Sequence, residues 1–233
     1  MKRSEKRNVE YEPSLVTYLD ILGFRNLIEH RSAGYISRTL RLVRDAVKPD
    51  SLDAKAYSLH YQSFSDLIVI TIPLSTQANL VYRPGALFSE LLALVHAQTS
   101  LIGERILIRG ALSVGFVVKS YGQLYGPALV RAYELERHTA QYPRIIIDRE
   151  VLDQLKTNPA LRRHDYRYEK KSIDALVTKD VDGLTFVDYL RAIESEFDYP
   201  EEEYLSFLVE HKKVVQAGFT NESDTRIREK YAT

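Results

Sequence analysis

The stretch LVTYLDILGF, residues 15–24, decides the fold class, because one charged side chain interrupts an otherwise apolar run. The apolar residues over 15–22 predict a buried strand, and Gly23 ends it before a helix that we expect over residues 24–47. Asp20 lies inside this strand, where a carboxylate is costly unless it is paired, hydrogen-bonded or bound to a metal. The stretch therefore places a candidate functional residue at the end of a buried strand.

A second carboxylate occupies a similar position. Asp66 opens the apolar strand 66–73, and residues 63–65 predict a tight hairpin between it and a strand over 56–62. If the two apolar strands are neighbours, Asp20 and Asp66 converge on one point. Two carboxylates together with substrate phosphates suit Mg²⁺ or Mn²⁺. The alternative is that each aspartate caps a turn, Asp20 at the helix that follows it and Asp66 in its own hairpin.

Hairpins and helices alternate along the rest of the chain. Further helices are expected over 84–102, 126–140, 148–155 and 200–217, and further strands over 105–118, 144–147, 166–173 and 184–189. This pattern predicts an α+β fold, with a mixed or mostly antiparallel sheet that is covered by helices. We expect a flexible N-terminal segment over 1–13, one catalytic domain over 14–192 and a C-terminal helical extension over 193–233.

Composition narrows the classes of function. The 233 residues include 32 Lys and Arg against 32 Asp and Glu, and this zero formal charge gives no sign of a nucleic-acid surface. The chain has no cysteine, which excludes disulfides and thiolate chemistry. The first ten residues lack an apolar segment, and the longest apolar run is far too short to span a bilayer. We therefore expect a cytoplasmic protein without a nucleic-acid or membrane partner.

Four motifs in order resemble the class III nucleotide cyclases, whose ferredoxin-like core the resemblance implies here. The motifs are YLDILGF at 18–24, FSD at 64–66, IRGALSVG at 108–115 and GPALVRAYELE at 126–136. The sequences of these motifs are similar in particular to those of the pyrimidine nucleotide cyclases of the bacterial Pycsar antiphage systems. The segment YPRI at 142–145 adds to that resemblance. The resemblance covers about residues 15–150.

The resemblance implies an activity and its cofactors. UTP, or in second place CTP, would be cyclised to its 3′,5′-cyclic monophosphate with release of pyrophosphate, to make a second messenger that triggers an effector protein in antiviral defence. Two Mg²⁺ or Mn²⁺ ions would be held by Asp20, Asp66 and the Ile21 carbonyl. The backbone amides of Leu22, Gly23 and Phe24 would receive the phosphates. The active site would form between the subunits of a homodimer.

Two positions depart from the family pattern. Purine-using class III enzymes carry an Asn and an Arg on the helix after the fifth strand, and here Val130 and Glu134 stand at these positions. Neither side chain can stabilise the transition state, so we expect Arg131 to act as the catalytic substitute. The alternative for Arg131 is a surface residue paired with Glu134 or Glu136.

The base pocket also differs. A Lys and an Asp read the base in adenylate cyclases, whereas Gln62 and Gln123 stand at these positions and argue against ATP. A glutamine amide both donates and accepts hydrogen bonds, which suits a pyrimidine edge. Tyr61 would narrow the pocket, but successive strand residues face opposite sides, so core packing is its alternative role.

Other readings stay open at this stage. Arg109 begins an apolar segment, where it would reach the triphosphate or a neighbouring subunit, or form a structural ion pair. For the whole chain the alternative functions are a catalytically inactive cyclase-like sensor or scaffold and a purine cyclase with an unusual pocket.

Overall fold

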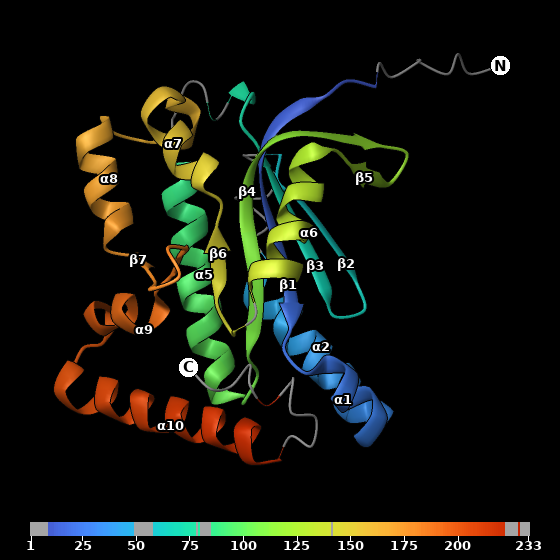
Figure 1. Cartoon of the computed structure of the whole chain (residues 1–233), viewed down its shortest axis with the longest axis vertical. Helices are drawn as coiled ribbons and strands as arrows, with labels where there is room; N and C mark the ends of the chain where they lie inside the picture. Colours follow the sequence, from blue (N-terminus) through green and yellow to red (C-terminus); the bar gives the residue numbers. More distant parts are fainter. Residues whose placement is uncertain are drawn as a thin grey trace.

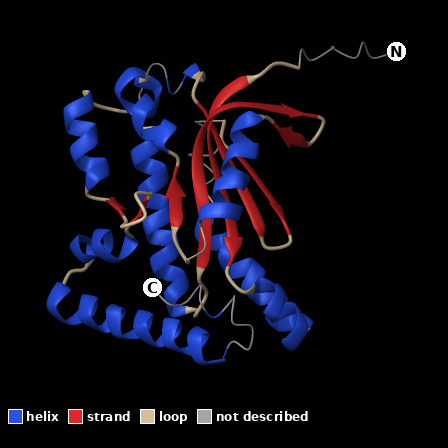
Figure 2. Ribbon diagram, viewed as in Figure 1, coloured by secondary structure: helices blue, strands red, loops and turns tan. Residues whose placement is uncertain are grey.

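The computed structural model describes residues 9–48, 58–77, 79, 85–140, 142–221 and 228. Their strands form one open sheet with helices on both faces (Figures 1 and 2). The strand order is β2-β3-β1-β4-β6-β8-β7, and β5 pairs with β4 outside this path. The strands are β1 (Glu12–Ile21), β2 (His60–Phe64), β3 (Leu67–Pro73), β4 (Ile108–Ser120), β5 (Gln123–Tyr125), β6 (Ile145–Ile147), β7 (Val177–Lys179) and β8 (Thr185–Val187).

The helices are α1 (Phe24–His30), α2 (Ala33–Val47), α5 (Ala86–Gly103), α6 (Pro127–Thr139), α7 (Arg149–Thr157), α8 (Tyr166–Asp174), α9 (Tyr189–Ala192) and α10 (Pro200–Asn221). Two short 3₁₀ helices, η1 (Pro159–Leu161) and η2 (Ile193–Glu196), are also present. Each segment that the sequence predicts as a helix is helical, with shifts in its bounds, whereas α8 and α9 were not predicted.

Strand β1 lies at the centre of the sheet, between β3 and β4, and runs antiparallel to both. Its register places Leu19 opposite Ile68 on β3 and Asp20 opposite Arg109 on β4. The pair β4–β6 is parallel, whereas β6–β8 and β7–β8 are antiparallel. The predicted mixed α+β sheet covered by helices is therefore confirmed.

The two faces of the sheet bury different side chains. Helix α6 covers one face, where Val16 of β1 packs with Val69, Val117 and Ala132. Helices α2 and α5 cover the other face, which holds the larger apolar core. Among the described residues, α5 alone is long and apolar enough to cross a membrane, but 56% of it is buried inside the protein. It is the central helix of the core.

The segment after Gly23 is two helices, where the sequence predicted one. Helix α1 ends at His30, and the Ser32 hydroxyl caps α2 by accepting a hydrogen bond from the Tyr35 amide at 3.3 Å. The first amides of a helix have no hydrogen-bond partner inside the helix, and a serine hydroxyl at the N-cap position accepts from one of them. Ser32 therefore favours the start of a new helix. The break falls two residues before Gly34.

The strand predicted over residues 166–173 is wrong, because this segment is helix α8. The Asp165 carboxylate accepts hydrogen bonds from the amides of Arg167 and Tyr168, and it thereby fixes the first turn. Glu169 and Ile173 are buried on one side, four residues apart, which is the spacing of a helix face. The strand that pairs with β8 is β7, which the sequence analysis missed.

Some predictions fall partly outside the described residues. These are the start of the strand over 56–62, Pro84 at the start of the predicted 84–102 helix, residues 1–8 of the N-terminal segment and most residues of the extension after 221. Within the described part, β1 already begins at Glu12, and α10 packs against α5 and η2 across one end of the fold (Figure 1).

Candidate active site

The structure brings Asp20 and Asp66 together. Asp20 is the penultimate residue of β1, and Asp66 lies in the two-residue turn between β2 and β3, next to Ser65 with φ 56°. Because β1 and β3 are paired up to Leu19 and Ile68, the end of β1 lies beside this turn. The two carboxyl groups hydrogen-bond to each other, so the convergence that the sequence predicted is present.

The electrostatics of this pair favour a cation. The pKa of Asp66 is raised from 3.8 to about 7, chiefly by burial and then by the hydrogen bond and the negative charge of Asp20. Two carboxylates that share one site cannot both ionise without cost, unless a positive charge lies between them. Among the described residues, no group of three or more His, Cys, Asp and Glu side chains is placed so that it could hold a metal ion. A metal here would therefore take the rest of its ligands from backbone carbonyls such as that of Ile21, from substrate and from water.

Arg109 orients Asp20. Its Nε and Nη2 atoms donate to Asp20 Oδ2 at 3.1 and 2.9 Å, and its Nη1 atom donates to the Ala140 carbonyl at 3.2 Å. The Nη2 atom also lies 2.8 Å from Glu136 Oε1, and both side chains of this second pair are nearly buried. Arg109 therefore forms the structural ion pair that was one of its alternatives. The single positive charge of Arg109 is shared by the carboxylates of Asp20 and Glu136. Arg109 forms no ion pair with Asp66.

Tyr18 closes the apolar side of the site. It precedes Asp20 by two residues on β1, so both side chains face α6. Its ring contacts that of Tyr133 edge-on, with 5.8 Å between centroids. The pKa of Tyr18 is raised to about 12, chiefly by burial and then by the charges of Glu136 and Asp20. Sequence reasoning missed Tyr18 and Glu136, although the two-residue spacing from Asp20 was a signal for the first.

The turn after Asp20 only partly matches its predicted role. The Leu22 amide donates to the Leu107 carbonyl at 2.9 Å, so it is engaged within the protein and does not face a phosphate. Gly23 adopts the left-handed conformation, with φ 75° and ψ 15°, which permits the sharp change of direction into α1. Phe24 is buried, and its side chain belongs to the core. The amides of Gly23 and Phe24 remain predicted phosphate ligands.

The predicted base-reading residues separate into two groups. Gln62 is exposed, and its Nε2 atom donates to the Gly122 carbonyl at 3.4 Å, so it lies next to Gln123 in the same chain. Tyr61 packs against the core on the other face of the sheet, where burial raises its pKa. The structure thus places Gln62 against the backbone of the hairpin that carries Gln123, and places Tyr61 in its alternative packing role.

Arg131 is not with the aspartate pair. Its Nε and Nη2 atoms donate to Asp148 Oδ2 and Oδ1 at 2.8 and 3.1 Å, which is a bidentate ion pair. Asp148 is buried at the start of α7, and the hydrogen bonds to it raise the pKa of Arg131. The expected surface partners Glu134 and Glu136 do not form this pair. Asp148 is the residue before the first turn of α7, but its side chain makes no capping hydrogen bond there.

Comparisons with known proteins identify the fold. No family model matches the chain, and no curated protein matches it either. Among solved structures, the adenylyl cyclase CyaB from P. aeruginosa superposes with a TM-score of 0.51 and 15% identity, over 77% of this chain and 95% of CyaB. The chain has the class III cyclase fold.

A second solved structure has the same coverage. The guanylyl cyclase domain of the RhoGC fusion protein from the fungus Blastocladiella emersonii gives a TM-score of 0.45 and 18% identity, over 76% of this chain and 95% of that domain. At such identities a likeness concerns the fold alone. In this cyclase fold, the activity has to be argued from the residues of the site.

Proposed function

We propose that the chain is a nucleotide cyclase that converts a pyrimidine nucleoside triphosphate, UTP before CTP, into its 3′,5′-cyclic monophosphate and pyrophosphate. The observation that carries this proposal is the contact between Asp20 and Asp66 at the ends of two paired strands. Two adjoining carboxylates are unfavourable in a folded protein unless they serve a cation. Cyclisation needs such a site, because the ribose 3′-hydroxyl must attack the α-phosphorus while charge develops on pyrophosphate.

The protein residues have separate tasks in this proposal. Two Mg²⁺ or Mn²⁺ ions held by Asp20, Asp66 and the Ile21 carbonyl would supply activation of the 3′-hydroxyl and neutralisation of phosphate charge. Arg109 fixes the orientation of Asp20 through its two hydrogen bonds to Oδ2. The Tyr18 ring excludes water from the apolar side of the carboxylate pair, which strengthens electrostatic interactions inside the site.

The two glutamines support a pyrimidine substrate. Gln62 contacts the backbone of the hairpin that carries Gln123, and neither position carries a charged side chain that would read the base. An amide pair presents donors and acceptors that complement the uracil or cytosine edge. The purine preference of CyaB belongs to that protein, and ATP is therefore an arm of the test.

Exposed apolar side chains support a homodimer whose active sites lie between subunits. They occur on the β2–β3 hairpin, on α6 and on the β4–β5 hairpin, all of which belong to the half of the fold that carries the aspartates and glutamines. These side chains are Phe64, Phe116, Tyr121, Tyr125, Val130 and Tyr133. Aromatic residues are enriched at protein–protein interfaces, and exposed ones also occur on α2, α8 and α10.

Product formation from ATP, GTP, CTP and UTP, each with Mg²⁺ or Mn²⁺, tests the proposal directly. A cyclic pyrimidine monophosphate made by the wild-type chain and lost in Asp66→Ala would support it. A cyclic purine monophosphate as the product would support the cyclase activity and reject the pyrimidine substrate. Absence of any product from folded dimers with all four nucleotides would refute the activity.

A mixing experiment tests the shared site. In the proposal, Asp20 and Asp66 of one chain face Gln123 and Arg131 of its partner. Mixed dimers of Asp66→Ala and Arg131→Ala would then contain one intact site and recover part of the activity. If verified mixed dimers stay inactive, the shared site or the role of Arg131 is wrong.

A second candidate function is an inactive nucleotide-binding sensor or scaffold. The pairing of Arg131 with Asp148 favours it, because an arginine held in a bidentate ion pair is not directed at a substrate. Nucleotide binding that is measurable by calorimetry, without product from any nucleotide, would select this function. If the chain is instead an active pyrimidine cyclase, its product is expected to act as the second messenger for an effector in antiviral defence.

A further inference from the structure

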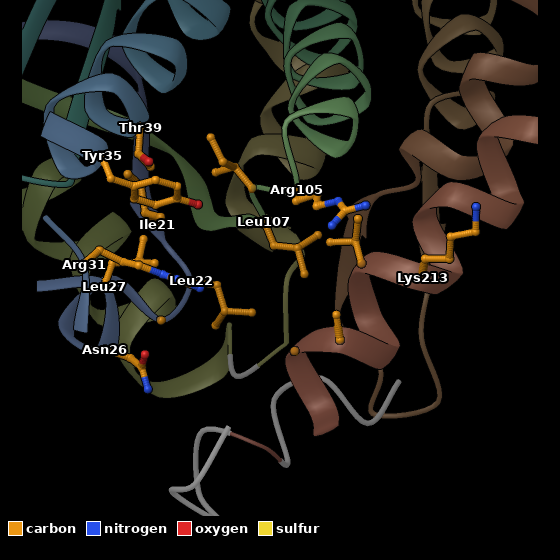
Figure 3. A pocket seen from close by; sticks show the side chains of 15 residues that line it. Ile21, Leu22, Asn26, Leu27, Arg31, Tyr35, Thr39, Arg105, Leu107 and Lys213 are labelled. Atoms are coloured by element: carbon orange, nitrogen blue, oxygen red, sulfur yellow. The ribbon is translucent and has the colours of Figure 1, made fainter. Parts of the chain in front are cut away.

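A cavity of about 470 Å³ lies on the side of the β1 end opposite to the Asp20 carboxylate. Its walls come from the turn after β1, from α1 and α2, from the turn between α5 and β4, and from α10. Figure 3 shows Arg31, Tyr35 and Thr39 on one side and Arg105 and Lys213 on the other, with Leu22 and Leu107 between them. The volume falls in the range of about 300–1,000 Å³ that is usual for small-molecule sites.

The charged side chains at this cavity are all cationic. Arg31, Arg105 and Lys213 line it, and no acidic residue is among its lining residues. Arg31 has no acidic partner among the described residues, and its guanidinium lies 5.5 Å from the centre of the Tyr35 ring. Glu210 is shared, because it lies 3.7 Å from Arg105 and 3.2 Å from Lys213. The cavity therefore carries an excess of positive charge that an anion would complement.

The interior of the cavity is apolar. Leu22, Leu107 and Val214 each expose 6% of their surface, and they form a floor between the cations. A free inorganic anion would gain little from this floor, whereas an organic body would bury its own apolar surface against it. Arg105 also adopts the left-handed conformation, with φ 59°, in the turn after α5. Glycine is the usual residue there, so the turn gives up some stability to place an arginine at the cavity.

We propose that this cavity binds a small amphiphilic anion, an organic molecule with an apolar body and one carboxylate, sulfonate or phosphate group. The anionic group would lie between Arg31 and Arg105, and the body would lie on the floor formed by Leu22, Leu107 and Val214. The bound molecule would touch the turn of residues 22–23, which begins two residues after Asp20. The consequence that occupancy changes the rate of cyclisation rests on the proposed function; the binding site itself does not.

The test uses 8-anilinonaphthalene-1-sulfonate, a fluorescent aromatic sulfonate whose emission rises in apolar surroundings. The full chain is titrated with the dye at low salt, together with the variants Arg31→Ala/Arg105→Ala and Ala217→Phe. Removing both arginines is expected to weaken binding by about tenfold or more, since each provides a charge-assisted hydrogen bond. Ala217→Phe narrows the cavity from α10, and is expected to remove the saturable binding while the arginines remain.

Arg25→Ala is the matched control, because Arg25 is an arginine on α1 whose side chain is 87% exposed, pairs with Glu29 and does not line the cavity. It should bind the dye as tightly as the wild-type chain. Equal affinity in all four proteins would overturn the site, since the dye would then bind elsewhere, for example on the exposed aromatic residues. Circular dichroism of each variant shows whether it is folded, and weakened binding in a folded double variant supports the proposal.

The outcome is separable from that of the proposed function. Arginine-dependent binding by a chain that makes no cyclic nucleotide would keep this site and reject the cyclase. Formation of a cyclic nucleotide without arginine-dependent dye binding would support the cyclase and reject this site. If both are found, the dye should change the rate of the wild-type chain and leave that of Ala217→Phe unaffected.

Discussion

Replacing Asp66 by asparagine should stabilise the metal-free protein at alkaline pH while abolishing its proposed activity. Folding raises the pKa of this carboxyl from 3.8 to about 7 through burial and through Asp20. At pH 8 the wild-type chain must hold an ionised Asp66 beside Asp20, whereas an amide at the same position carries no charge. The variant removes this repulsion and keeps the size and hydrogen-bonding capacity of the side chain.

The magnitude follows from the pKa difference. About three pH units at about 1.4 kcal/mol each give an upper limit of about 4 kcal/mol. Because Asp66 is only half-buried, screening by solvent reduces this to about 1–2 kcal/mol. The sign is the reverse of that for a salt-bridged aspartate. The wild-type chain is not penalised below pH 3.8, loses stability as the pH rises from 3.8 to about 7, and loses no more above that.

Urea denaturation in the presence of a chelator, at several pH values from 5 to 8, measures the effect. The free energy of unfolding of Asp66→Asn should exceed that of the wild type by an amount that grows with pH. Asp198→Asn, at an exposed position, provides the control and should show no such trend. Added Mn²⁺ should reverse the order by stabilising only the wild type. A wild-type chain that is more stable than Asp66→Asn at pH 8 without metal would refute the reasoning.

Three further substitutions test the surroundings of the site. Arg109→Ala should cost about 3 kcal/mol in urea denaturation, because it takes the arginine away from two nearly buried carboxylates; an unchanged midpoint would show that the ion pairs contribute nothing. Gly110→Ala should destabilise the fold by more than about 3 kcal/mol, since its Cβ would lie 2.3 Å from the Tyr18 carbonyl oxygen. Its control Gly34→Ala, which meets nothing within 4 Å, should be neutral or stabilising by about 0.5 kcal/mol. Burial raises the pKa of Glu90, so the wild type should lose stability relative to Glu90→Gln as the pH rises, and parallel pH curves in thermal denaturation would contradict this.

The sequence predicted the elements that carry the site because local signals there agree with one another. A single carboxylate in an apolar strand, followed at once by Gly23, specifies a strand end and a turn without reference to distant residues. The same reasoning placed Tyr61 and Gln62 on opposite faces, because the period of a strand is two. The contact of Gln62 with the β4–β5 hairpin and the packing of Tyr61 against the core agree with that prediction.

The rest of the site depends on contacts between residues that are far apart in the chain. The bonds of Arg109 to Asp20 span 89 residues and follow from the register of β1 on β4, which no local pattern encodes. Arg131 was expected to be the catalytic substitute, with Glu134 or Glu136 as alternative partners, but Asp148, buried just before α7, holds it in a bidentate ion pair. The wrong prediction of a strand over residues 166–173 has a different cause. The tyrosines of this segment favour a strand locally, whereas the Asp165 cap and tertiary packing stabilise a helix.

The central place of β1 limits how the aspartate pair can respond to other molecules. β1 is hydrogen-bonded along both edges, and Asp66 lies in the turn that leads into its neighbour β3. A change in the separation of the two carboxylates would therefore break hydrogen bonds of two interior strands. Each such bond contributes about 1 kcal/mol, and interior strands open only in the rarest fluctuations of a protein. Their amide protons should therefore exchange among the slowest in the molecule. An effector would have to act on what surrounds this rigid pair, such as the glycine turn beside it or the approach of a second chain, and not on the spacing of the carboxylates themselves.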